Sequence, residues 1–200
     1  MNALFAAALA VHTIMEQEQI PFCIIGGLAV IRWGEIRVTR DVDLTALTGF
    51  AATAACAARI AARLTPRRDD AVAFALKHRV LLVAAPNGVA VDISLGALPY
   101  EEHLVQRASC FAFAPDCSVR TCSAEDLVVL KAFAGRDRDW ADIAGVIARQ
   151  GVALDWSYIL PALEDLCALR DDTLTVPRLL RLRAQELGPS PHAEETASHD

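Results

Sequence analysis

Two aspartates, Asp41 and Asp43, stand one residue apart in a short apolar stretch. In an extended strand, alternate residues point to the same face, so both carboxylates would lie side by side while Val42 and Leu44 face the core. Adjacent anions repel each other unless a cation lies between them. Oxygen ligands suit Mg²⁺, which also holds phosphate oxygens. The pair therefore predicts a magnesium and phosphate site; the alternative is a surface turn with two solvated aspartates.

Two glycines, Gly26 and Gly27, precede this pair and follow the apolar run Phe22–Ile25. That run is typical of a buried strand, and residues 28–33 form a segment of helix length. Glycine allows backbone N–H groups to approach a ligand closely, and the N-terminus of a helix favours anions. The glycine pair therefore predicts a phosphate-binding turn.

A third acid, Asp92, interrupts an apolar run at residues 89–95. A turn signal at residues 86–88 separates this run from residues 79–84, and the two runs together predict a β-hairpin. A lone carboxylate in the middle of a buried strand is costly unless it is paired, hydrogen-bonded or bound to a metal. The alternative to a functional role is a satisfied aspartate on an edge strand.

The order strand, Gly-Gly, short helix and Asp-hydrophobic-Asp-hydrophobic resembles the catalytic motif of the nucleotidyltransferase superfamily, which has a polymerase-beta-like fold. The resemblance implies an enzyme that moves an NMP from an NTP substrate to an acceptor hydroxyl. It also implies that Asp41, Asp43 and Asp92 hold two Mg²⁺ ions. Asp92 could in addition accept the proton of the attacking hydroxyl.

A helix expected over residues 123–133 carries Lys131 and is followed by a polar stretch that contains Asp139 and Asp142. This run resembles the AbiEii-type nucleotidyltransferases, the toxins of type IV toxin–antitoxin systems. The resemblance implies that Lys131 contacts nucleotide phosphates and that Asp139 or Asp142, three residues apart on one helix face, completes the site. Asp139 is favoured for the catalytic role, and Asp142 is kept as a nucleotide-binding candidate. The alternative is a salt-bridge cluster that caps a helix.

A loop with four charged residues connects the short helix to the Asp-x-Asp pair. Its arginines Arg37 and Arg40 could reach a triphosphate, because guanidinium groups bind phosphate oxygens well. The alternative is that they are solvated or pair with Glu35.

Composition limits the classes of function. The chain has 200 residues and a formal net charge of −6, which argues against a generally basic nucleic-acid surface and leaves only a local patch. Charged or polar residues interrupt each apolar run before it reaches the length of a membrane span. The six cysteines are scattered without a Cys-x-x-Cys pair, which is typical of reduced thiols in a cytoplasmic protein.

The expected fold class is α/β (α+β): a nucleotidyltransferase fold with a small mixed sheet flanked by helices and a C-terminal helical region. We expect a catalytic domain at residues 1–120 and a helical region at 121–187 that completes the nucleotide cleft. The segment 188–200, rich in Pro, Ser, His and Glu, is expected to be a disordered tail.

Three functions fit these features. The first is transfer to tRNA, other RNA or protein, with an antitoxin encoded nearby as partner and no membrane involved. The second is adenylylation of a small molecule such as an antibiotic. The third is a non-catalytic module that binds a nucleotide or an antitoxin.

Overall fold

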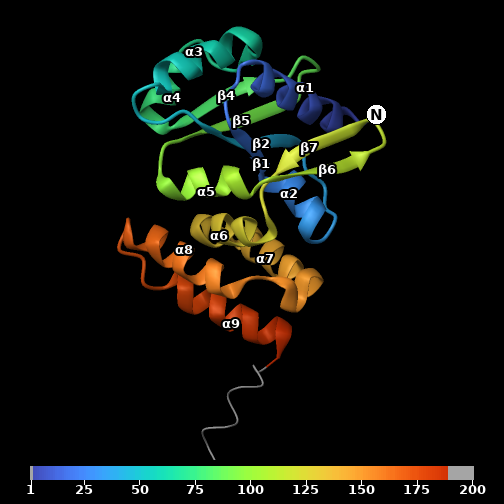
Figure 1. The fold of residues 1–200 in the computed structure, drawn as a ribbon, viewed down its shortest axis with the longest axis vertical. Helices are drawn as coiled ribbons and strands as arrows, with labels where there is room; N and C mark the ends of the chain where they lie inside the picture. Colours follow the sequence, from blue (N-terminus) through green and yellow to red (C-terminus); the bar gives the residue numbers. More distant parts are fainter. Residues whose placement is uncertain (1, 189–200) are drawn as a thin grey trace, which may run out of the picture. The chain divides into compact units, whose positions relative to one another are not determined.

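The computed structural model describes residues 2–188, which fall into two compact units (Figure 1). Residues up to Arg32 together with Ile36–Ser123 form a sheet unit. The segment Trp33–Glu35 and the chain from Ala124 onward form a helical unit. The expected roles of the ranges 1–120 and 121–187 stay predictions, and the expected tail lies outside the described residues apart from Gly188.

The predicted α/β class is confirmed, because helices accompany the strands of one mixed sheet. In chain order the elements are α1 (Ala3–Gln17), β1 (Phe22–Ile25), α2 (Gly26–Trp33), β2 (Asp41–Leu47), α3 (Thr53–Arg63), β3 (Thr65–Pro66), α4 (Ala71–His78), β4 (Val80–Ala84), β5 (Ala90–Gly96), α5 (Pro99–Arg107), β6 (Ser109–Ala114), β7 (Cys117–Thr121), α6 (Ala124–Ala134), α7 (Asp137–Gln150), the 3₁₀ helix η1 (Gly151–Ala153), α8 (Trp156–Ala168) and α9 (Thr175–Leu187).

The sheet has the strand order β3-β4-β5-β2-β1-β7-β6. Strand β2 pairs in parallel with β5 and antiparallel with β1, so the two strands that carry the predicted acids are neighbours. Side chains alternate between the two faces of a strand. Val42, Leu44, Val91 and Ile93 are fully buried on one face, and the intervening residues point to the other.

The buried face of the sheet forms one core with α1, α3 and α4. Met15 of α1 and Ile60 of α3 are fully buried in this core together with Leu44. Figure 1 shows α1 and α3 on one side of the sheet and α5 on the other. The face opposite the main core is therefore the one that presents the predicted acids.

The sequence does not predict the edge strand β3, because Thr65 and Pro66 indicate only the end of a helix. In the structure these residues pair with Ala84 and Val83 of β4 at the edge of the sheet. Proline is tolerated there because an edge strand has no further neighbour that needs its N–H group. The predicted hairpin of β4 and β5 is confirmed.

The helical unit contains α6 to α9 and the three-residue segment Trp33–Glu35. Arg149 donates to the carbonyl of Gly34 at 2.7 Å. The carboxylate of Asp126 is completely buried and accepts a hydrogen bond from the hydroxyl of Tyr158 at 2.6 Å. This contact joins α6 to α8.

Across residues 2–188, every helix is too short or too polar to cross a lipid bilayer. The six cysteines are free thiols. The cytoplasmic location stays a prediction.

Candidate active site

The register of β2 and β5 brings the predicted acids onto one face of the sheet unit. Asp43 lies directly opposite Asp92, and Asp41 lies opposite Ala90. Residues opposite each other on paired strands project from the same face, as do residues two apart on one strand. Asp41, Asp43 and Asp92 therefore share one face of the sheet, and we call these three residues the acid row.

One of the two glycines lies against a residue of the acid row, and the other lies against a threonine that is hydrogen-bonded to that row. Gly26 opens α2 with a φ of +61°, and a Cβ placed on it would overlap Oδ2 of Asp43. A Cβ on Gly27 would overlap Oγ1 of Thr39. That hydroxyl in turn donates a hydrogen bond of 3.0 Å to Oδ1 of Asp41. A side chain at Gly26 would therefore displace Asp43, and one at Gly27 would displace Thr39.

Replacing Gly26 with alanine is expected to lower nucleotidyl transfer about 100-fold, because small displacements of a reacting site are costly. It should also destabilise the fold, since a left-handed alanine costs about 1–2 kcal/mol and the new methyl group must displace Asp43. The matched control is Gly49→Ala, because Gly49 has a φ of +60° with nothing within 4 Å of its added Cβ. Transfer rates and urea denaturation of the two variants separate the cost of an alanine at positive φ from the effect of displacing Asp43. Equal losses of activity in both variants would contradict this role of Gly26.

An arginine that the sequence does not single out contacts the acid row. Arg67 follows β3, and its Nη2 donates to Oδ1 of Asp92. The backbone N–H of Arg67 donates to the carbonyl of Leu82 at 3.1 Å, which fixes the arginine beside β4. The sequence around Arg67 is a run of two arginines and two aspartates at residues 67–70, which indicates only mixed surface charge and does not identify this contact.

The acid row suits a hard divalent cation in its donor chemistry, because it offers carboxylate oxygens from two neighbouring strands. Among residues 2–188, however, no three His, Cys, Asp or Glu side chains are grouped closely enough to hold a metal ion together. Asp92 is bonded to Arg67 instead. The backbone positions thus fit a metal site, whereas the carboxylate of Asp92 is engaged elsewhere.

The loop arginines Arg37 and Arg40 lie just before β2. Arg37 donates to the carbonyl of Val38 at 3.3 Å, and Arg40 is exposed. Their contact with a triphosphate stays a prediction.

In the helical unit, Lys131 lies between the two aspartates predicted to act with it. Its Nζ lies 2.8 Å from Oδ1 of Asp139 and 2.7 Å from Oδ2 of Asp142. The side chains of Asp139 and Asp142 are buried, with exposed fractions of 6% and 5%, and that of Lys131 is mostly buried, with an exposed fraction of 11%. Asp139 also accepts from the backbone N–H of Arg136 at 3.3 Å, at the start of α7. The structure therefore joins Lys131 to both aspartates, and we call the three residues the lysine cluster.

The chain matches the family described as "Nucleotidyl transferase AbiEii toxin, Type IV TA system" over residues 14–198. The chain belongs to the AbiEii nucleotidyltransferase family. This membership confirms the predicted resemblance and the predicted enzyme class. No curated protein matches the chain at a significant level.

Three solved structures are similar to this AbiEii chain to different degrees. An antigenic nucleotidyltransferase-like protein from Paracoccidioides brasiliensis has a TM-score of 0.51 and 15% identity, covering 88% of this chain and 92% of that one. A solution structure of the antibiotic-resistance factor ANT(2'')-Ia has a TM-score of 0.43 and 17% identity, covering 90% and 89%. Its crystal structure in complex with adenylyl-2''-tobramycin has a TM-score of 0.43 and 14% identity, covering 90% and 95%. The first of these confirms the nucleotidyltransferase fold.

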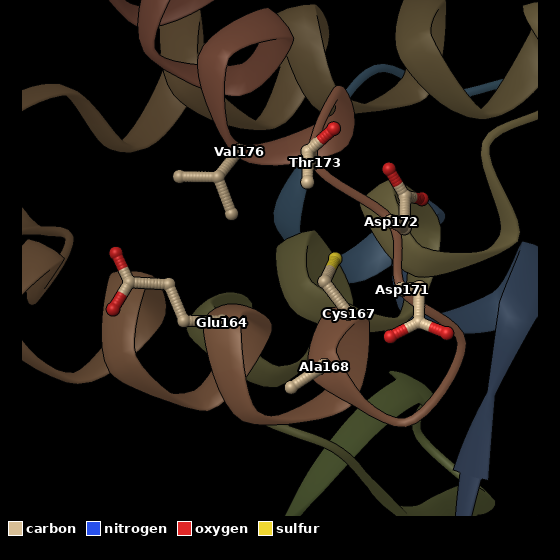
Figure 2. A pocket seen from close by; sticks show the side chains of 7 residues that line it. All are labelled: Glu164, Cys167, Ala168, Asp171, Asp172, Thr173 and Val176. Carbon is tan, nitrogen blue, oxygen red and sulfur yellow. The ribbon is translucent and has the colours of Figure 1, made fainter.

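The helical unit of the AbiEii chain also contains an acidic hollow of about 410 Å³ between α8 and α9. Figure 2 shows Glu164 and Cys167 on α8, with Thr173 and Val176 opposite them. Asp172 at its edge already accepts hydrogen bonds from the Thr175 hydroxyl at 2.7 Å and from two backbone N–H groups. These bonds indicate that Asp172 serves to begin α9 and not to bind a ligand.

The Thr175 hydroxyl and the N–H groups of Leu174 and Thr175 hold the pKa of Asp172 far below its usual range. Because the pKa is lowered in the folded state, the charged carboxylate stabilises the fold at every pH above its ordinary pKa of about 4. This stabilisation is lost as the pH falls from that value toward the lower pKa of the folded state. Asp172→Ala is therefore expected to lower the unfolding midpoint by about 2–4 °C at neutral pH. The deficit should shrink below about pH 4. Thermal unfolding at a series of pH values measures the difference in midpoint between the wild type and the variant. The control is Asp165→Ala, because Asp165 is exposed. A difference that stays constant down to about pH 2 would contradict the stabilising role of the Asp172 carboxylate.

Proposed function

We propose that this chain is a Mg²⁺-dependent nucleotidyltransferase that moves an NMP from an NTP to an acceptor hydroxyl on RNA or protein. We further propose that it acts as the toxin of a type IV toxin–antitoxin pair, with an antitoxin encoded nearby as its partner. The observation that carries the proposal is the register of Asp43 with Asp92, on the same face as Asp41 and against Gly26. Family membership supports the reaction class.

This arrangement supports the roles that we propose for the residues of the sheet unit. Asp41 and Asp43 would hold the cation, with Asp92 as the third ligand. A bound Mg²⁺ supplies charge neutralisation for the phosphates and lowers the pKa of the attacking hydroxyl. The backbone N–H groups at Gly26 and Gly27 lie at the start of α2, where a helix favours a phosphate group.

In the proposed transfer, the acceptor oxygen forms a bond to the α-phosphorus while the bond from that phosphorus to the bridging oxygen breaks. Pyrophosphate leaves with the electron pair of that bond. The hydroxyl proton passes to a carboxylate of the acid row, and Asp92 is the proposed acceptor. By family resemblance, Lys131 is proposed to contact the nucleotide phosphates, with Asp139 or Asp142 completing that site.

The test is incubation of the full chain with each α-³²P-labelled NTP and Mg²⁺, together with total tRNA, cell protein or aminoglycosides. Label in tRNA or protein that disappears with EDTA supports the proposal. Label only in an aminoglycoside would favour a small-molecule adenylyltransferase. NTP binding by calorimetry with no transfer would favour a non-catalytic module. The toxin role is tested separately, by growth arrest on expression and its reversal by the product of a neighbouring gene.

A further inference from the structure

One row of paired residues crosses the sheet from its edge to the candidate site. Arg67 bonds to Leu82 through its backbone, Leu82 lies opposite Asp92, and Asp92 lies opposite Asp43. Neighbouring strands are about 4.8 Å apart, so Arg67 starts about 10 Å from the strand of Asp92. An extended arginine side chain spans most of that distance, and its guanidinium reaches Oδ1 of Asp92.

The negative charges of the acid row favour a nearby cation. The three carboxylates of the acid row place three negative charges on one face, and like charges in neighbouring positions destabilise a sheet. Arg67 supplies one positive charge to Asp92. The exposed fractions of the two side chains are 34% and 38%, so solvent and ions reach the pair. A pair this exposed is weak and can exchange its partners.

We propose that Arg67 is an internal counter-ion of the site, which holds Asp92 in the metal-free enzyme and gives Asp92 up when a divalent cation binds. This inference depends on the proposed function, because it assigns Asp92 to the cation site. The counter-ion role explains why the three carboxylates share one face of the sheet but, among the described residues, are not grouped closely enough to hold a metal ion. Arg67 is thus a positioning residue that competes with the cation for one carboxylate.

The test is the affinity for Mn²⁺ alone, measured without nucleotide by electron paramagnetic resonance of the free ion. Arg67→Met removes the competitor and is expected to tighten Mn²⁺ binding about fivefold, the upper range for an exposed ion pair. The matched control is Arg68→Met. Arg68 is the adjacent arginine, pairs with Asp70 at 2.8 Å and lies over the ring of Phe74, so its loss should change the affinity less than about twofold.

The outcomes separate this proposal from the proposed function. Unchanged or weaker Mn²⁺ binding in Arg67→Met would overturn the counter-ion role, because the guanidinium would then not compete with the cation for Asp92. Equal tightening in Arg68→Met would also overturn it, because a general charge effect would explain both. Asp43→Asn is the test of the site itself, and retained Mn²⁺ binding in that variant would overturn the metal site whatever Arg67 does. Thermal unfolding confirms that each variant is folded, and Arg67→Gln provides a second neutral variant.

Discussion

Replacing Asp43 with asparagine is expected to lower NMP transfer at least about 10³-fold while the chain stays folded. Asparagine keeps the shape of the side chain and one oxygen, but it removes the negative charge that would hold a cation. Asp43 lies opposite Asp92 and against Gly26, so its carboxylate has the central position in the acid row. The measurement is transfer of ³²P from the preferred α-labelled NTP to the acceptor.

The stability of this variant should not fall along with its activity. Removing one of the like charges relieves repulsion in the metal-free protein, so the unfolding midpoint should stay the same or rise slightly. The matched control is Asp116→Asn, an exposed aspartate between β6 and β7 that is expected to keep full activity. An Asp43→Asn variant that retains more than about a tenth of wild-type transfer would contradict the catalytic role.

Most of the sheet unit could be predicted because its signals are local. The alternation of Asp41, Val42, Asp43 and Leu44 indicates a strand with one buried face, and the structure has that strand. The turn at residues 86–88 likewise predicts the β4–β5 hairpin. The pairing of β2 with β5 is different, because register between strands that are not consecutive depends on tertiary packing. Only the family resemblance places Asp92 beside Asp43.

The features that the sequence does not reveal depend on partners far away along the chain. Pro66 indicates the end of a helix, and only the neighbouring β4 makes it part of an edge strand. Arg67 gains its contact because that strand lies within reach of Asp92, 25 residues later. Asp126 is an acidic residue in the first turn of α6, yet its carboxylate is buried and accepts a hydrogen bond from Tyr158, 32 residues away. No local pattern specifies such contacts.

The lysine cluster is an intermediate case. The spacing of Asp139 and Asp142 predicts that they share one helix face, and both do contact Lys131. Helical spacing cannot show that α6 and α7 pack closely enough to bury both aspartates against Lys131. The choice between Asp139 and Asp142 therefore stays open, because the structure gives Lys131 nearly equal distances to both.

Replacing Lys131 with methionine is expected to lower the free energy of unfolding by about 3–5 kcal/mol, the typical cost of breaking a buried ion pair by removing one of its two partners. Methionine has a similar length, so the loss reports on charge and not on packing volume. Asp139 and Asp142 would remain buried on one helix face without the ammonium group between them. Urea denaturation followed by circular dichroism measures the change. The control is Lys77→Met, since Lys77 is the other lysine of the chain and is exposed on α4.

A triple variant separates the structural role of the lysine cluster from its proposed contact with the nucleotide. Asp139→Asn and Asp142→Asn, combined with Lys131→Met, remove both buried anions together with their counter-ion, so more than about half of the lost stability should return. Calorimetry then measures NTP binding by a chain that is folded but has no ammonium group at position 131. If the lysine cluster contacts the nucleotide, NTP affinity should remain at least about tenfold below wild type, because a charged hydrogen bond to phosphate contributes about 1.5–3 kcal/mol. Recovery of affinity along with stability would instead assign the lysine cluster to the fold alone.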